Sequence, residues 1–381
     1  MKDRTAGFPG DLQHFEVAGR LTIDLAALKA NWTALARRAE PAEAAAVVKA
    51  DAYGLGIERV VPALCAAGCK TFFVAILSEA RRVRAVAPDA TVYVLEGLAF
   101  GAAPVFRDYA LRPVLGSLEE IDHWAVFCRE WGKPLPAAVH VDTGMTRLGL
   151  TPEEAEDLSA DPTHFDHFRL TLVMSHLACA DVPDDPMNGR QLRQFQEVRR
   201  HLPEAPASLA NSAGTLIGGD YRFDLVRPGV AIYGGRAIST GDNPMRPVVT
   251  VEARIIRIRE AAAGTPVGYG AMETLKRDSR LAILSAGYAD GYIRASGSTD
   301  ERPGAIVTIN GRAAPVVGRV SMDLLAVDIT DFTENTVKTG DYAQLLGNQF
   351  TVDDLAERAG TIGYEVLTNL GRRFQHVVKV D

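Results

Sequence analysis

The stretch "AAVVKADAYGLG", residues 45–56, decides the fold of this chain. Its run of small and β-branched apolar residues is typical of a strand buried on both faces. The run ends at Lys49, and Asp51, Tyr53 and two glycines follow. An ammonium group in that position is either half of a structural ion pair, for instance with Asp51, or a functional amine.

Seven more short apolar runs follow, and together they predict a barrel. The eight runs span residues 44–50, 71–77, 91–97, 111–116, 136–142, 169–177, 206–212 and 225–234. Helical patterns lie between most of them, and "SLEE" and "TPEE" each begin one with a capping hydroxyl. Eight such units within about 220 residues predict an α/β fold with an N-terminal (β/α)8 TIM-type barrel. A doubly wound sheet is the rival, but "GLGIER" lacks the third glycine of its G-x-G-x-x-G turn.

After about residue 240 the predicted strands no longer alternate with helices, which predicts a second, mainly β domain. Runs such as "PVVTVEARIIRIRE" and "GAIVTINGRAAPVVGRV" have little helix between them, and Asn310-Gly311 indicates a hairpin turn. We expect a disordered lead-in at 1–18, a strand region at 19–28 that joins the later β domain, the barrel at 29–240 and the mainly β domain at 241–381.

The composition argues against nucleic-acid and membrane partners. A formal net charge of −7 gives no attraction for polyanions. No stretch approaches the roughly 18 continuous apolar residues of a membrane helix, and the first 20 residues lack the apolar centre of a signal peptide. We therefore expect a cytoplasmic protein with reduced cysteines.

Cysteine and histidine spacings predict no metal site. Cys65 and Cys69 lie four apart on one face of a predicted helix, but no second pair completes a tetrahedral set. His164 and His167 have H-x-x-H spacing in a polar loop without further ligands.

Chemistry-bearing residues follow the strands at their C-terminal ends, where barrels carry their active sites. They are Lys49, Tyr53, Asp142, Arg147, His176, Asn211, Ser212, Arg227 and Gly229. The loops after strands seven and eight, "ANSAG" and "RPGVAIYGG", offer hydroxyl, amide and backbone N–H donors for a phosphate. A desolvated lysine is a nucleophilic amine, so the expected cofactor is an aldehyde with a phosphate, pyridoxal 5′-phosphate (PLP).

Over roughly residues 19–375 the sequence closely resembles the alanine racemases, fold-type III PLP enzymes. Seven motifs occur in family order: "AVVKADAYGLG", "VDTGMTRLG", "ANSAG", "VRPGVAIYG", "VGYG", "AGYADGY" and "VGRVSMD". The resemblance implies a PLP-dependent isomerase, EC 5.1.1.1, that racemises alanine and supplies D-alanine for peptidoglycan. It also implies a homodimer in which β-domain residues complete the active site of the other subunit.

The resemblance also implies the roles of individual residues. Lys49 binds PLP covalently and is one catalytic base, and Tyr269 is the other. The phosphate is held by Tyr53, Ser212, Gly229 and Val230, with Asn211 beside them. The ring is contacted by Arg227 at the pyridine nitrogen, His176 on its face and Arg147 near its hydroxyl and the substrate carboxylate. The substrate site and its entrance are lined by Tyr288, Met322 and Asp323.

The residue chemistry agrees with this assignment. Racemisation removes a proton from one face of Cα and delivers one to the other, so two bases should flank it. Lysine and tyrosine both have reference pKa values of about 10, so burial and nearby cations must tune them. A guanidinium does not release its proton. Arg227 would therefore leave the pyridine nitrogen unprotonated, which disfavours a long-lived carbanion and transamination.

Two positions depart from the family pattern. Many members have a lysine that becomes carbamylated just before "VDTG", where this chain has His140. A histidine cannot supply the carbamate's negative charge, so we expect a bound anion or a neighbouring carboxylate to orient Arg147. Near the C-terminus, Arg372 stands close to where many members place a tyrosine at the phosphate.

Other interpretations remain open at this level. Taken alone, His176 is typical of a hydrogen-bonded core histidine, Tyr288 of domain packing and Met322 of a gap filler. A serine or broad-specificity racemase would share the whole constellation. A PLP decarboxylase fits "VGYG" and "VGRVSMD" less well, and a non-catalytic PLP-binding protein would hold the cofactor without exchange at Cα.

Overall fold

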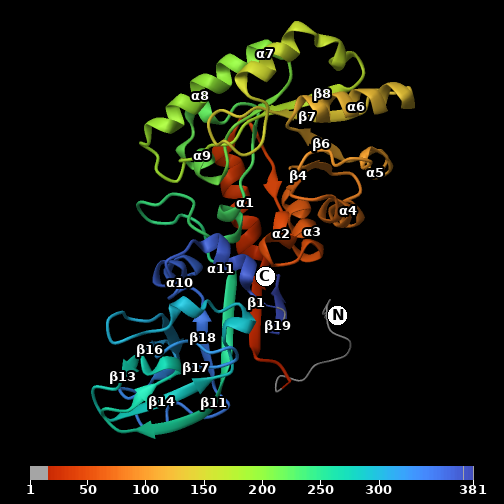
Figure 1. Cartoon of the computed structure of the whole chain (residues 1–381). Helices are drawn as coiled ribbons and strands as arrows, with labels where there is room; N and C mark the ends of the chain where they lie inside the picture. The colour runs from red at the N-terminus through yellow and green to blue at the C-terminus, as the bar shows by residue number, and fades with distance from the viewer. Residues whose placement is uncertain (1–15, 372, 381) are drawn as a thin grey trace. The chain divides into compact units, whose positions relative to one another are not determined.

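The structure, a computed structural model, describes residues 16–371 and 373–380. The expected disordered lead-in at 1–18 falls mostly outside the described residues, as does Arg372. The chain divides into two compact units (Figure 1). The β unit comprises residues up to Ala27, Tyr233–Gly235 and Arg246 onward, and the barrel unit comprises Leu28–Ile232 and Arg236–Met245.

The barrel unit contains the eight predicted parallel strands. They are β2 and β3 (Glu43–Ala44 and Ala46–Val47, together the first), β4 (Thr71–Val74), β5 (Thr91–Val94), β6 (Arg112–Leu115), β7 (Pro136–His140), β8 (Arg169–Met174), β9 (Ala207–Ser208) and β10 (Leu225–Val226). Strands β3 to β9 pair in sequence order, and β10 pairs with β2. The ring closes between β9 and β10, where Asp224 N donates to Ala207 O (3.0 Å) and Arg227 N to Ala210 O (2.9 Å). The predicted (β/α)8 barrel is thereby confirmed.

The helices of this unit lie around the outside of the strands (Figure 1). They are α1 (Leu25–Ala39, which begins in the β unit), α3 (Ile57–Ala67), α4 (Leu77–Val86), α5 (Ala103–Asp108), α6 (Leu118–Trp131), α7 (Pro152–Ala160), α8 (Pro186–Val198) and α9 (Ser212–Ile217). Ser117 caps α6 and Thr151 caps α7 through their side-chain oxygens, as "SLEE" and "TPEE" predict. Cys69 lies beyond the end of α3, so the prediction that Cys65 and Cys69 share a helix face is wrong.

Most strands are shorter than the apolar runs that predict them. The first ends at Val47, two residues before Lys49. The run at 225–234 gives only β10, and the chain then forms the 3-10 helix η4 (Val230–Tyr233). Apolar residues continue past the hydrogen-bonded ladder because the loops at this end of the barrel are buried as well: Val48, Leu209 and Val230 are all fully buried.

The β unit is built on one curled sheet. Its strands are β1 (Gly19–Asp24), β11 (Val249–Ala261), β14 (Ser279–Leu284), β15 (Ile306–Ile309), β16 (Arg312–Val317), β17 (Leu325–Asp328), β18 (Tyr342–Leu346) and β19 (Gln375–Lys379). Their order is β14-β17-β16-β15-β18-β11-β1-β19, and β11 also pairs with β14. Strand β11 changes partner from β18 to β14 along its length, with an irregularity between Ile255 and Arg257. Such bulges bend a strand, and here the bend lets six strands close on themselves.

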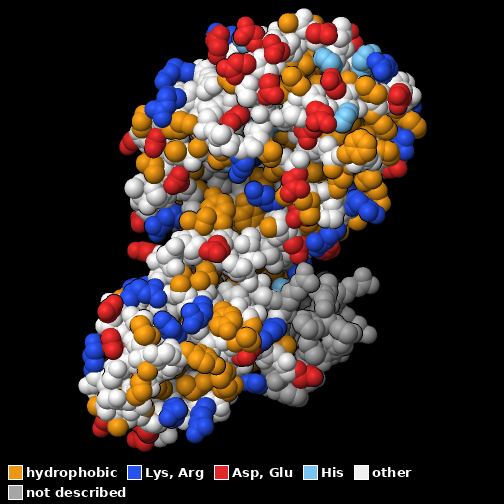
Figure 2. All heavy atoms as spheres, viewed as in Figure 1, with side chains coloured by type: hydrophobic (Ala, Val, Ile, Leu, Met, Phe, Trp, Pro, Cys, Tyr) orange, Lys and Arg blue, Asp and Glu red, His pale blue; other side chains and the backbone are white. Residues whose placement is uncertain are grey.

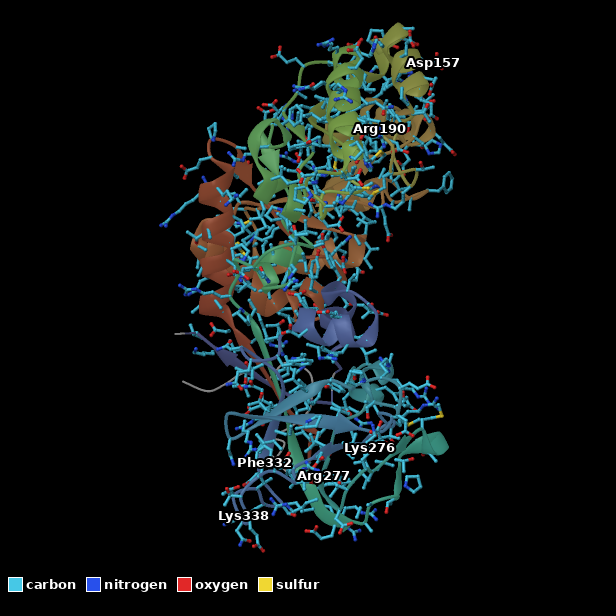
Figure 3. The ribbon with its side chains drawn as sticks, turned by 90° about the vertical axis from the view of Figure 1, so that its left-hand side faces the viewer. Asp157, Arg190, Lys276, Arg277, Phe332 and Lys338 are labelled. Carbon is cyan, nitrogen blue, oxygen red and sulfur yellow. The ribbon has the colours of Figure 1, made fainter. Side chains whose placement is uncertain are left out.

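Smaller elements and side-chain pairs complete the β unit. They are β12 (Pro266–Val267), β13 (Glu273–Thr274), α10 (Val352–Ala359) and α11 (Gly363–Asn369). Asn310 and Gly311 have φ values of 51° and 77° between β15 and β16, so the hairpin prediction is confirmed. Strand β1 pairs antiparallel with β11, Leu21 opposite Val251. Arg277, labelled in Figure 3, forms ion pairs of 3.5 Å with Asp328 and 2.8 Å with Asp331.

Candidate active site

Lys49 begins a left-handed helical turn at the end of the first barrel strand. Ala50 to Tyr53 all have φ between 53° and 55°, and Gly54 follows at 84°. Gly54 N closes the turn by donating to Ala50 O at 2.8 Å. Left-handed backbone costs L-residues roughly 1–2 kcal/mol each, so four in a row must be held by their surroundings. The sequence gives no sign of this turn, because only Asp51 among the four tolerates such a conformation well.

The environment of the Lys49 amine favours its neutral form. Desolvation first, and then the Arg147 cation, lower the pKa of Lys49, while the Glu79 carboxylate opposes them. A lysine with a lowered pKa has more of the unprotonated amine that can attack a carbonyl carbon. The structure therefore gives Lys49 the electrostatics of a nucleophile and not of a simple ion pair with Asp51.

Arg227 is buried, with 3% of its surface exposed, and is held by acceptors on three sides. Its guanidinium donates to Ser175 O at 2.5 Å, to Ser208 Oγ, and toward His176 Nδ1 at 3.4 Å. Burial lowers the pKa of Arg227, but these acceptors favour the charged form, and a guanidinium stays protonated at neutral pH. The site thus contains a fixed positive charge.

His176 is a neutral imidazole beside this charge. Desolvation and then the Arg227 and Arg147 cations hold the pKa of His176 well below its usual value. Because Arg227 can only donate, His176 Nδ1 must accept, which places the imidazole proton on Nε2. His176 therefore offers a flat, uncharged ring with a defined tautomer.

A cradle of hydroxyl and backbone groups lies at the ends of strands β9 and β10. Ser212 Oγ accepts from Gly229 N at 2.8 Å and from Ala231 N at 3.4 Å. A Cβ atom on Gly229 would lie 2.3 Å from the Tyr53 hydroxyl, so the missing side chain is what lets Tyr53 approach. Asn211 caps α9 by accepting from Gly214 N at 2.9 Å.

These residues fit PLP. The cofactor needs an amine for its aldehyde, donors for its phosphate and a partner for its ring nitrogen. The structure provides Lys49 with a lowered pKa, a hydroxyl cradle in which a Cβ has no room, and a buried guanidinium. Tyr53, Gly229 and Ser212 thus lie together, and so do Arg227 and His176. Lys49 interacts electrostatically with Arg147 and His176.

The predicted residues of the β unit lie on adjoining loops. Tyr269 stands between Gly268 and Gly270, whose φ values are 77° and 79°, and is 69% exposed. A Cβ atom on Gly268 would lie 3.2 Å from the backbone N of Arg319. Asp323, four residues after Arg319, accepts a hydrogen bond from Arg373 Nη1 at 2.7 Å.

Tyr288 is tied to the same loop. Tyr288 N donates to Ser321 O and Ala289 N to Met322 O, both at 3.0 Å. Tyr288 and Met322 are 41% and 53% exposed, and Figure 2 shows hydrophobic side chains gathered on the visible face of this unit. Contiguous patches of exposed apolar side chains are typical of surfaces that bind a partner or a ligand.

His140 is buried and uncharged. Burial first, and then the Arg227 and Arg147 cations, lower the pKa of His140 to about 4, against the opposite effect of Asp142. The neighbouring carboxylate of Asp142 accepts three backbone N–H groups at 2.9 Å, from residues 144, 145 and 146. Asp142 thus holds the backbone of the loop before Arg147, and His140 supplies no negative charge.

Two buried side chains near the site come from helices and were missed by reading strand ends. Glu79 on α4 contacts the Lys49 turn. Gln191 on α8 donates to His176 O at 2.9 Å and to Thr143 Oγ1 at 3.3 Å, and so joins the ends of β7 and β8. The only sequence signal was Glu79 in the first turn of a helix, which predicts local capping alone.

The mouth of this (β/α)8 barrel carries a nucleophilic amine, a fixed guanidinium and a phosphate-type cradle, and the chain has a separate β unit. These features define a class of enzyme that uses an amine-reactive cofactor with a phosphate group. Comparisons with known proteins narrow the class. Residues 23–237 match the model of the alanine racemase N-terminal domain, and residues 248–378 match that of its C-terminal domain. The chain belongs to the alanine racemase family.

Individual members of this family match nearly the whole length of this chain. An alanine racemase from Methylobacterium sp. (strain 4-46) is 52% identical over 354 residues, which cover 93% of this chain and 96% of that protein. A biosynthetic alanine racemase from Agrobacterium fabrum is 49% identical, with 93% and 92% covered. The crystal structure of the Bartonella henselae alanine racemase with covalently bound pyridoxal phosphate has a TM-score of 0.90 at 38% identity, covering 95% of this chain and 99% of that one.

Proposed function

We propose that this protein interconverts L-alanine and D-alanine with PLP bound at Lys49. The observation that carries the proposal is the Lys49 amine, whose pKa is lowered at the mouth of a barrel that also holds Arg227 and the Tyr53–Gly229 cradle. The relatives described above support alanine as the substrate, because each is named an alanine racemase and the match covers more than 90% of its length. D-alanine for peptidoglycan is the product we assign to it.

PLP, when bound, withdraws electrons from an attached amino acid and so makes the hydrogen on Cα acidic. Lys49 removes or returns the proton on one face of Cα, for which its lowered pKa suits it. Tyr269 does so on the other face. Tyr53, Ser212, Gly229 and Val230 would hold the phosphate end of the cofactor, with Asn211 beside them.

Arg227 decides which reaction follows. With PLP bound, its fixed charge would keep a proton off the pyridine nitrogen. The ring would then be a weaker electron sink, which would favour return of a proton to Cα over transamination. His176 would contact the ring as a neutral partner, and Arg147 would bind near the ring hydroxyl and the substrate carboxylate. Because His140 is neutral, a bound anion or a neighbouring carboxylate would hold the Arg147 guanidinium.

The second base is supplied by another copy of the chain. Tyr269, Tyr288 and Met322 are exposed on the β unit, which supports a homodimer in which these side chains and Asp323 face the partner's barrel. Mixing Lys49→Ala with Tyr269→Phe tests this. Each variant alone has two defective sites, but a mixed dimer has one intact site, so activity should return after subunit exchange. No recovery with heterodimers present would refute the shared site.

The reaction itself is tested on the purified protein. Polarimetry across a panel of L-amino acids should show racemisation of alanine, with serine as the competing substrate. Borohydride should fix PLP to the peptide that contains Lys49, and Lys49→Ala should abolish both signals. Bound cofactor without exchange at Cα would instead indicate a non-catalytic PLP-binding protein.

The place of action is proposed to be the cytoplasm. None of the described helices is long and apolar enough to cross a membrane. The four cysteines are free thiols, which a reducing compartment maintains, so we expect the enzyme to be recovered with the cytoplasmic fraction on cell fractionation.

A further inference from the structure

A buried carboxylate links the Lys49 turn to the next unit of the barrel. Glu79 lies in the first turn of α4 and is 8% exposed. Its Oε2 accepts from Ala75 N at 2.9 Å, at the start of its own helix. Its Oε1 accepts from Asp51 N at 3.1 Å, inside the left-handed turn.

We propose that Glu79 is a positioning residue, which holds the left-handed turn after Lys49 and thereby fixes the direction in which the Lys49 amine points. The inference rests on the proposed role of Lys49 as the PLP-binding residue. It adds a contact from α4 that no motif around Lys49 contains.

The turn needs such a contact because its backbone is unfavourable. Asp51 is one of four consecutive non-glycine residues with positive φ. A carboxylate that accepts a backbone N–H forms a charge-assisted hydrogen bond, stronger than a neutral one. Arg82, on the same helix, also binds Asp51 Oδ1 at 2.6 Å, but both side chains are 40% exposed and such pairs contribute little. The buried Glu79 is the main clamp.

The charge of Glu79 also acts on the amine. The charged and titratable groups that interact electrostatically with Lys49 are Glu79 on α4, Arg147 after β7 and His176 after β8. His176 is neutral, so Arg147 and Glu79 oppose one another: the cation lowers the pKa of Lys49 and the carboxylate raises it. Removing the carboxylate should therefore lower the pKa of Lys49 further. A purely structural role would not predict that shift.

The barrel contains a matched control for this arrangement. Glu120, in the first turn of α6, accepts from Gly116 N at 2.6 Å at its own helix start and from Leu98 N at 2.9 Å in the loop after β5. It makes the same double contact two units further along the barrel, but the loop that it holds carries none of the proposed site residues. Glu79→Gln and Glu120→Gln therefore remove equivalent contacts, because an amide has one acceptor oxygen where the carboxylate has two.

The experiment measures how fast Lys49 captures PLP. Full-length wild type, Glu79→Gln and Glu120→Gln are freed of cofactor, mixed with PLP at a series of pH values and quenched with borohydride. The labelled Lys49 peptide is quantified by mass spectrometry. For Glu79→Gln we expect capture at the high-pH plateau to slow roughly 10- to 100-fold, since a displacement of about 1 Å can cost 100-fold. The pH midpoint should move to lower pH, because the neutral amine reacts. Glu120→Gln should lose similar thermal stability and capture PLP as the wild type does.

The outcomes separate the possibilities. A Glu79→Gln variant with wild-type rate and midpoint would overturn the inference, and so would equal slowing in both variants. If Glu79→Gln does not fold, hydrogen exchange of wild-type residues 50–56 decides: slow exchange of the Asp51 amide supports the clamp, and rapid exchange beside a protected β4 refutes it. Wild type that never labels Lys49 would instead contradict the proposed function.

Discussion

Gly229→Ala is expected to weaken PLP binding through Tyr53. The new Cβ would lie 2.3 Å from the Tyr53 hydroxyl, whereas ordinary contact begins at 3.4 Å, so the hydroxyl must move by about 1 Å. Gly229 is not among the glycines with positive φ, so alanine causes no backbone strain there. A hydrogen bond from a hydroxyl to a charged phosphate contributes about 1.5–3 kcal/mol. Its loss should raise the Kd for PLP roughly 10- to 100-fold.

The assay is titration of cofactor-free protein with PLP, followed by the absorbance of the bound cofactor. Gly189→Ala is the control: it makes the same substitution on α8, where the Cβ meets only Arg193 Nη1 at 3.4 Å, and should bind as the wild type does. Tyr53→Phe removes the oxygen that the Cβ would meet. The double variant should therefore bind about as weakly as Tyr53→Phe alone, since neighbouring sites are not additive. Wild-type affinity in Gly229→Ala, or additive losses in the double variant, would refute the reasoning.

Three further outcomes are expected. Arg227→Glu should lower racemisation and raise transamination, measured as pyruvate formed per turnover; Arg227→Gln, which keeps a donor for Ser175 O, controls for lost stability. Racemisation should respond to chloride more than to gluconate at equal ionic strength, and equal responses would exclude an anion beside Arg147. His140 binds a proton below about pH 6.5 when unfolded but only below about pH 4 when folded, so stability falls as the pH drops between these values. Over that pH range, the free energy of unfolding of His140→Asn, measured with urea, should fall by roughly 3 kcal/mol less than that of the wild type. Parallel curves of this free energy against pH for the two proteins would contradict the reasoning.

The sequence alone determined the elements whose causes are local. Apolar runs predicted all eight barrel strands, because a strand buried on both faces must be apolar at successive positions. "SLEE", "TPEE" and Asn310-Gly311 predicted two helix starts and a hairpin, because capping and turn geometry depend on residues within four positions. The barrel residues of the candidate site could be proposed because parallel strands of a barrel end on the same face.

Only the tertiary structure decided how those residues are held. The left-handed turn after Lys49 has no local cause, since alanine and tyrosine disfavour it. It depends on Glu79, 28 residues away. Arg227 is fixed by a carbonyl 52 residues earlier in the chain, that of Ser175, and the Tyr53 hydroxyl fits because Gly229 lacks a side chain. The lowered pKa values of Lys49 and His140 likewise follow from burial and from the cations Arg147 and Arg227, which lie in the loops after β7 and β10. Hydrogen bonds, steric contact and electrostatic interactions act through space, so these features are set only when distant segments of the chain meet.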